Sequence, residues 1–273
     1  CAVAARIARG TTDRDIILFC GYHGWHDWYQ SANYLVDRDS GEYPFAGIEP
    51  IGVPRALAGT AIPFTYGDLD MLGRLFTEHQ DQIAGVMMEP ARSDRPEPGY
   101  LEGVKELCKR NGSLLIFDEV SCGWRESIGG MQKVLDVTPD MTVLAKGISN
   151  GYPMGAIVGS REAMEAARLM FISSSYWTDN VGLAAALTTI RELKARDSEK
   201  RLKEMGEQAA RAIDGAVQSA GLTGTCTGFS TTPNLNLDLP DPDLQLKVFT
   251  LFIQEMAKRG IHGYMGFGPT LAH

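Results

Sequence analysis

The sequence predicts an α/β fold in which a mostly parallel sheet is flanked by helices and followed by part of a smaller C-terminal α+β domain. Short continuous apolar segments alternate with amphipathic helical segments over most of the chain, which is the pattern of parallel strands buried on both faces. From Gly221 onward the segments shorten and the alternation ends. We therefore expect a large domain over residues 1–219, which includes a long connecting helix, and part of a small domain over residues 220–273.

The predicted strands are short apolar segments that are bounded by polar residues or glycine. They cover residues 16–20, 83–88, 114–117, 142–145 and 154–158, and a further strand-like piece covers residues 235–239. Residues 21–60 are rich in glycine, proline and aromatic residues, and we expect a long irregular segment there. Loops of this length inside compact domains are usually functional.

The predicted helices are amphipathic segments with recognisable ends. Residues 1–9 form the first helix, and we expect Gly10 to end it. Asp68 can cap a helix that runs to about His79, because its carboxylate can accept a hydrogen bond from a free amide of the first turn. Further helices are expected over residues 99–111, over residues 181–219 as two segments joined near Asp197, and over residues 241–259.

Composition argues against several classes of function. The net charge is -8 without a basic cluster, which argues against nucleic-acid binding. No apolar segment approaches the ~18 residues of a membrane helix, and no signal peptide opens the chain. The cysteines are Cys1, Cys20, Cys108, Cys122 and Cys226. They lack the paired spacing of a zinc site, so we predict no metal site. We also predict free thiols and a reducing cytoplasm.

Three ionisable residues directly follow predicted strands: Glu89, Asp118 and Lys146. Ligands of open α/β sheets collect beyond the carboxyl ends of the strands. A carboxylate and a lysine there suit a cofactor that needs a Schiff base and a protonated pyridine nitrogen. Taken alone, however, a lysine after a strand is usually surface charge and an aspartate is usually a helix cap, so these residues leave that alternative open.

The strings around this pair resemble a known family. LLIFDEVSCGWR and PDMTVLAKGISNGYPMGAIVGS are similar to the core of the class III (fold type I) aminotransferases that depend on pyridoxal 5'-phosphate (PLP). Within that class they look most like the glutamate-1-semialdehyde 2,1-aminomutase group and its sugar or amine transaminase relatives. The resemblance implies PLP as the cofactor and fold type I. It assigns the internal aldimine to Lys146, the partner of the pyridine nitrogen to Asp118, and a contact with the ring face to Val120.

Other segments carry the same resemblance. CGYHGWHDWY is similar to the segment whose aromatic residue stacks on the pyridine, which falls on Tyr22 with His23 beside it, although ordinary loop packing is the local alternative. GVMMEPAR implies that Glu89 lines the site. SSSYWTDNVGLAAAL is similar to the segment in which a threonine of the neighbouring subunit binds the cofactor phosphate. The matching position is Ser175, with Thr178 as an alternative, and either residue could instead cap the following helix.

The resemblance implies PLP-dependent amino-group transfer, of the transaminase or the aminomutase type, on a small amino/keto or amino-aldehyde molecule. A cytoplasmic homodimer with the site at its interface is implied as well. The family carries segments before and after this chain, among them an S-G-x-E-A phosphate cradle, so we expect a chain that lacks N- and C-terminal parts. The alternative is a truncated or degenerate member that folds without catalysing. His26, Asp27 and Arg125 could face substrate, or could be solvated loop residues and a structural ion pair.

Overall fold

The computed structural model of the chain describes residues 1–35, 49–91 and 94–261. The chain divides into two compact units. The first unit comprises residues 1–90, 96–123 and 129–189, and the second comprises residues 91–95, 124–128 and 190–273. The division falls within a long helix, and the domain boundary expected at residue 219 stays a prediction.

The first unit is built on a six-stranded sheet with the order β2-β1-β3-β4-β5-β6. Neighbouring strands from β2 to β5 are parallel, and β6 pairs antiparallel with β5. The predicted mostly parallel sheet is therefore confirmed. The strands are β1 (Ile16–Cys20), β2 (Ala61–Pro63), β3 (Ile83–Met88), β4 (Leu114–Asp118), β5 (Met141–Leu144) and β6 (Ala156–Gly159).

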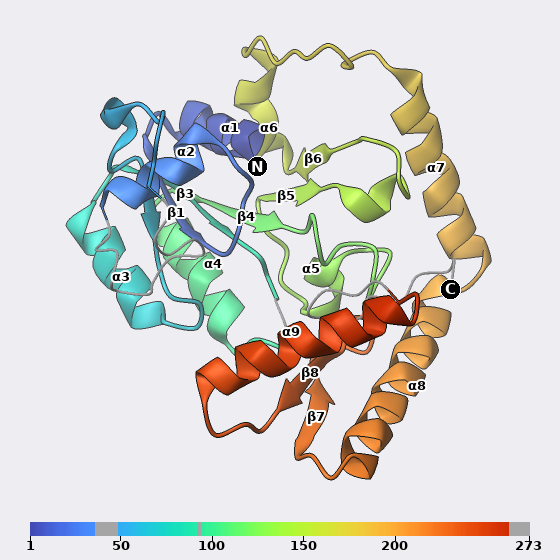
Figure 1. Ribbon diagram of the computed structural model, residues 1–273. Helices are drawn as coiled ribbons and strands as arrows, with labels where there is room; N and C mark the ends of the chain where they lie inside the picture. The colour runs from blue at the N-terminus through green and yellow to red at the C-terminus, as the bar shows by residue number, and fades with distance from the viewer. Residues whose placement is uncertain (36–48, 92–93, 262–273) are drawn as a thin grey trace. The chain divides into compact units, whose positions relative to one another are not determined.

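Helices cover both faces of this sheet (Figure 1). On one face, the alanines and Ile7 of α1 pack on β1, β3 and β4, together with residues of α6. On the other face, Leu72 and Phe76 of α3 and Leu101 and Val104 of α4 pack on the same strands. Burial on both faces explains why these strands are apolar along their length, apart from Asp118 at the end of β4. The helices that begin in this unit are α1 (Ala2–Thr12), α2 (Asp27–Gln30), α3 (Leu69–Glu78), α4 (Tyr100–Arg110), α5 (Met131–Val134), α6 (Arg161–Met164) and α7 (Asn180–Ala195), and α7 continues into the second unit.

Most predicted elements are found with shifts of one or two residues at their ends. Asp68 caps α3 as expected, since its Oδ1 accepts a hydrogen bond of 2.7 Å from the amide of Met71. The expectation that Gly10 ends the first helix was wrong, because α1 continues to Thr12. Gly10 lies inside the helix where the side chain of Met170 approaches so closely that a Cβ atom would overlap it. The glycine serves close packing there and not helix termination.

Residues 21–60 are less irregular than predicted. Asp27–Gln30 forms α2, and 3₁₀ turns follow at Ser31–Tyr34 and Arg55–Leu57. Residues 36–48 of this segment lie outside the described residues.

The second unit contains helix α8 (Ser198–Ser219), a two-stranded antiparallel sheet and helix α9 (Pro242–Lys258). The small sheet pairs β7 (Gly224–Thr227) with β8 (Asn234–Leu237). The break predicted near Asp197 is confirmed, and Asp197 adopts a left-handed conformation with φ 49° between α7 and α8. Gly206 of α8 lies against the backbone of Ser230, where a Cβ atom would overlap the carbonyl oxygen.

No helix within the described residues is both long enough and apolar enough to span a bilayer.

Candidate active site

The predicted site residues follow the carboxyl ends of four adjacent parallel strands of the first unit. Tyr22 and His23 follow β1, Glu89 follows β3, Asp118 ends β4 and Lys146 comes after β5. The strands are neighbours in the order β1-β3-β4-β5, so their carboxyl ends form one edge of the sheet. This is the edge at which open α/β sheets bind ligands.

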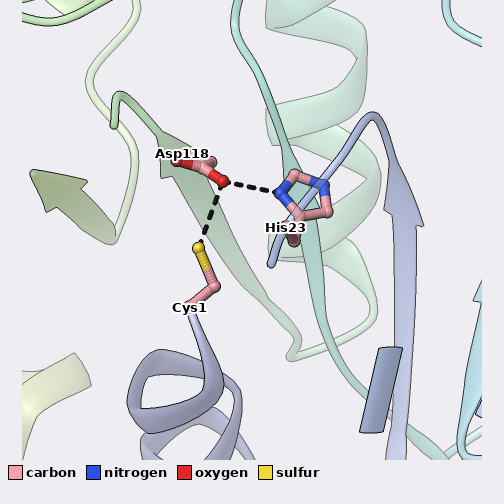
Figure 2. Close-up of side chains that lie close together, drawn as sticks. All are labelled: Cys1, His23 and Asp118. Atoms are coloured by element: carbon pink, nitrogen blue, oxygen red, sulfur yellow. Dashed lines mark hydrogen bonds and ion pairs between the residues drawn. The ribbon is translucent and has the colours of Figure 1, made fainter. Parts of the chain in front are cut away.

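Asp118 is one of the two fully enclosed residues of this group, with 3% of its surface exposed against 1% for His23. Its Oδ2 atom lies 2.8 Å from Nδ1 of His23 and accepts a hydrogen bond of 3.1 Å from Sγ of Cys1 (Figure 2). Its Oδ1 atom accepts a hydrogen bond of 3.0 Å from the amide of Val120. A carboxylate offers about four acceptor positions. Three are occupied by these described partners, which leaves about one acceptor position, on Oδ1, without a partner among the described residues.

His23 is buried between two oxygen atoms. Its Nε2 atom lies 3.0 Å from the backbone carbonyl of Cys20, which can only accept, so Nε2 carries a proton. The Nδ1 atom on the other side of the ring is thereby directed at Oδ2 of Asp118.

Lys146 begins a 3₁₀ turn, Lys146–Ile148, directly beyond β5. Its Nζ atom donates a hydrogen bond of 2.7 Å to Oγ of Ser121, three residues after Asp118. Lys146 has a left-handed backbone with φ 47°, whereas the other described non-glycine residues with positive φ are aspartates or asparagines, apart from Trp124. This conformation costs a lysine about 1–2 kcal/mol. Such strain is typical of functional sites.

Lys146 and Ser121 are both exposed. The amine is therefore open to an incoming molecule.

Glu119 follows Asp118 but is turned away into the protein. It is fully buried, and its carboxylate accepts hydrogen bonds from the amides of Met131, at 2.7 Å, and Gln132, at 3.1 Å. Burial raises the pKa of Glu119 above its usual range, against the opposing effect of these two hydrogen bonds. Burial also raises the pKa of the Cys122 thiol. Burial thus shifts both groups toward their neutral forms, and both support the structure around Asp118.

A cleft of about 1560 Å³ opens beside this site. Val120 and Cys1 line it, together with Ala145, which precedes the lysine. Tyr176 and Trp177 line it from the segment before α7. The cleft is large enough for a cofactor together with a small substrate.

The remaining predicted residues lie in different surroundings. Tyr22 is 43% exposed, and its ring packs edge-on against Tyr29 at 5.9 Å between ring centroids. Glu89 is half-buried beside Gly21, where a Cβ atom would come within 3.4 Å of its carboxylate carbon. Ser175 and Thr178 are exposed in the segment that leads to α7. Their predicted roles at the cofactor stay predictions.

Cys1 and Ser121 were not predicted from the sequence as site residues. Cys1 is separated by 117 positions from the aspartate that it contacts, and no local motif marks it. Ser121 lies inside the string that carries the family resemblance, but only the structure shows that it contacts Lys146.

The fold and this strand-end site define a class of proteins, the fold type I transferases. Residues 66–220, which are more than half of the chain, match the model of the class-III aminotransferase family. The chain belongs to this family, whose members use PLP.

Two curated relatives extend the match beyond these residues. The chain is 31% identical over 281 residues to a 3-aminobutyryl-CoA aminotransferase of Cloacimonas acidaminovorans, covering 98% of this chain and 64% of the relative. It is also 31% identical over 291 residues to a glutamate-1-semialdehyde 2,1-aminomutase of Brevibacillus brevis, covering 99% of this chain and 66% of the relative. The chain thus spans slightly less than two thirds of their length.

A solved structure agrees with the fold. It is the PLP internal aldimine form of the FumI protein of Sphingopyxis sp. MTA144, with a TM-score of 0.81 and 26% identity over 98% of this chain and 62% of that chain. The predicted class III family and fold type I are thereby confirmed.

Proposed function

We propose that this chain is the cofactor-holding part of a PLP-dependent class III enzyme that transfers an amino group on a small molecule. When bound, PLP supplies an electron sink that makes the proton on the amino-bearing carbon of a substrate acidic. The observation that carries the proposal is the placement of two side chains on neighbouring strands. Asp118, at the end of β4, is a buried carboxylate with one open acceptor position. The adjacent strand β5 leads to the exposed amine of Lys146.

Asp118 fits the part of the ring-nitrogen partner. Its carboxylate is fixed by Cys1, His23 and Val120, so it is oriented before any ligand arrives. The open acceptor position on Oδ1 suits the N–H group of a pyridinium ring. A charge-assisted hydrogen bond to a carboxylate that is buried from water keeps the ring nitrogen protonated.

Lys146 fits the part of the amine that would hold the cofactor. It lies beyond β5, and its Nζ atom is held by Ser121 instead of by a carboxylate. Once freed by an incoming amine, the same Nζ atom would take the proton from the substrate carbon and return it to a different carbon.

The faces of the ring would be covered by Val120, which lines the cleft, and by the half-exposed Tyr22. Ser175 and Thr178 are proposed as hydroxyls that a second copy of the chain offers to the cofactor phosphate. Both are exposed, as a residue that serves a partner subunit must be before the subunits associate. The proposed substrate is an amino aldehyde such as glutamate-1-semialdehyde, with a keto sugar second, and the proposed location is the cytoplasm.

PLP binding tests the proposal. Purified wild-type protein is titrated with PLP, and the absorbance spectrum of the cofactor is expected to shift and saturate at one equivalent per chain. Lys146→Ala should lose this shift because it lacks the amine. Lys105→Ala removes an exposed lysine of α4 and is the matched control that should behave as the wild type. A spectrum that shifts equally in the Lys146 variant would overturn the assignment.

A second function, a folded chain that does not catalyse, is favoured by the exposure of Lys146. An open amine is poorly shielded from water, whereas catalysis of this type benefits from a closed site. Single-turnover exchange of an amino group between a donor amine and bound PLP separates the two functions. Formation of the aminated cofactor supports the enzyme, and its absence in a chain that binds PLP supports the non-catalytic member.

A further inference from the structure

A thiol, an imidazole and a carboxylate meet at the end of β4. The Sγ atom of Cys1, Nδ1 of His23 and Oδ2 of Asp118 all lie within 4.8 Å of one another (Figure 2). They come from the start of α1, the loop after β1 and the end of β4. His23 and Asp118 are buried, and Cys1 is half-buried. These three donor atoms are the types that bind zinc in proteins.

The orientation of His23 suits a metal ligand. Its Nε2–H group donates to the carbonyl of Cys20, which fixes the ring and directs the Nδ1 lone pair at Asp118. Histidines that bind metals characteristically donate their other ring N–H to a carbonyl or carboxylate in this way. Two lone pairs that face each other at 2.8 Å require a cation between them. A proton meets this requirement, and so does a metal ion.

We propose that Cys1, His23 and Asp118 bind one Zn²⁺ ion when the cofactor is absent, with water as the fourth ligand. Zinc would displace the thiol proton and the proton shared by His23 and Asp118, and both are released to solvent. Bonds of about 2.0 Å to nitrogen and oxygen and about 2.3 Å to sulfur, in a tetrahedron, separate the ligand atoms by about 3.3–3.6 Å. The side chains must therefore move apart by about half an ångström from the distances of 2.8 and 3.1 Å.

The donor set selects the metal and the cleft admits it. A thiolate and an imidazole favour Zn²⁺ over Mg²⁺ or Ca²⁺, which prefer sites made of oxygen atoms alone. Cys1 lines the cleft beside the site, which provides a path from solvent. The site escapes prediction from cysteine spacing because its ligands are separated by 95 and 117 positions along the chain.

A link between metal and cofactor arises if Asp118 also holds the ring nitrogen, and this link rests on the proposed function. Zn²⁺ on Oδ2 would then take the negative charge that a pyridinium N–H on Oδ1 needs, so metal ion and cofactor would exclude each other. Zinc would hold the chain in a form that cannot take up PLP.

Cobalt tests the site by spectroscopy, because Co²⁺ replaces Zn²⁺ and absorbs light. In the cofactor-free chain we expect a thiolate-to-cobalt band in the near ultraviolet, together with visible bands of a tetrahedral ion. Both should saturate at one Co²⁺ per chain and disappear when Zn²⁺ is added. Cys1→Ser should lose the near-ultraviolet band. Cys226→Ser, which changes another half-buried cysteine, is the matched control and should keep it.

The zinc affinity is measured by competition with a chelating dye. Cys1→Ser and His23→Ala should each weaken the zinc affinity at least about 10-fold. Even the loss of a residue that only supports a metal ligand weakens metal affinity by about this much. Circular dichroism confirms that the conservative Cys1→Ser chain is folded. If Zn²⁺ binds the Cys1→Ser chain as tightly as the wild type, or no saturable band forms with Co²⁺, the metal site is refuted whatever PLP does.

The competition is measured separately. PLP should lower the apparent zinc affinity of the wild-type chain in proportion to its concentration. Failure of PLP to bind the metal-free chain counts against the proposed function and leaves the zinc result standing. Zinc and PLP that bind together without competition would refute the mutual exclusion.

Discussion

At the scale of single residues, Asp118 is defined by the donors around it. A carboxylate that is 3% exposed requires hydrogen bonds, and the structure supplies them from Cys1, His23 and Val120. Two of these donors come from parts of the chain that are distant in sequence. The position of Asp118 after a predicted strand was enough to predict it as a site residue. Its hydrogen-bond donors could not be predicted because they depend on tertiary packing.

Replacing Asp118 by Asn tests the role of its charge. The amide carries no negative charge to pair with a pyridinium N–H group, and a hydrogen bond to a charged group is worth about 1.5–3 kcal/mol. We expect the PLP affinity to fall about 10- to 100-fold in the titration described above. Asp136→Asn is the control, because Asp136 is exposed and asparagine tolerates its left-handed φ of 55°. Unchanged affinity in the Asp118 variant would refute its role.

The pKa of Glu119 makes a prediction about stability. Because burial raises this pKa in the folded chain, the folded state binds more protons than the unfolded state between pH 4.5, the ordinary value, and the raised value. The contribution of Glu119 is therefore fully present below this window and is lost as the pH rises through it. We expect the free energy of unfolding of the wild type, relative to Glu119→Gln, to fall across the window.

Urea unfolding of both proteins at several pH values from 4.5 upward measures this difference. A difference that stays constant or rises with pH would contradict the raised pKa.

At the scale of elements, the segment after β4 is shaped by Gly130. Its backbone, with φ 79° and ψ 177°, is accessible almost only to glycine. A Cβ atom there would also overlap the carboxylate of Glu119. The glycine thus lets the amides of Met131 and Gln132 reach Glu119, which fixes the chain next to Asp118.

Gly130→Ala should therefore lower the free energy of unfolding by about 1–3 kcal/mol, the usual cost of such a backbone conformation. Gly129→Ala is the neighbouring control, because its new Cβ atom would meet only the side chain of Lys133, which can move. Chemical denaturation of both variants gives the comparison. An equal loss in both would show that Gly130 has no special role.

How far the sequence predicts this fold depends on the kind of element. Apolar strands and capped helices follow from local patterns, so β1, β3 and α3 are predicted closely. Strand β2 is only Ala61–Pro63 and gives no alternating or continuous signal, and β7 (Gly224–Thr227) is similarly short and polar. The prediction that Gly10 ends the first helix was wrong because a local pattern does not show the contact with Met170, which comes from a distant part of the chain.

At the scale of the whole molecule, an apolar surface near the cleft has no cover within the described residues. It lies in the segment before α7 and at the start of α7, and several of its side chains are largely exposed. They are Leu169, Phe171, Tyr176, Trp177, Val181, Leu183 and Leu187. Exposed large apolar side chains that gather in one segment are typical of an interface. We propose that a second copy of the chain covers it, since Ser175 and Thr178 lie in the same segment.

Replacing Phe171, which is 92% exposed, by Glu places a charge in this surface. If a second copy covers it, light scattering should give twice the chain mass for the wild type and a single chain mass for the variant. Ile51→Glu changes a residue that is 87% exposed and does not belong to this surface, and it should leave the mass unchanged. A Phe171 variant that stays dimeric would show that the interface between the two copies lies on a different surface.

Lys146 is proposed as the amine that holds PLP. Borohydride reduction of the PLP-loaded chain, followed by mass spectrometry of its peptides, shows which residue carries the cofactor. We expect the added cofactor mass on the peptide that contains Lys146, at that residue and near one equivalent. Cofactor mass that is spread over several surface lysines, or that is found at another single residue, would contradict it.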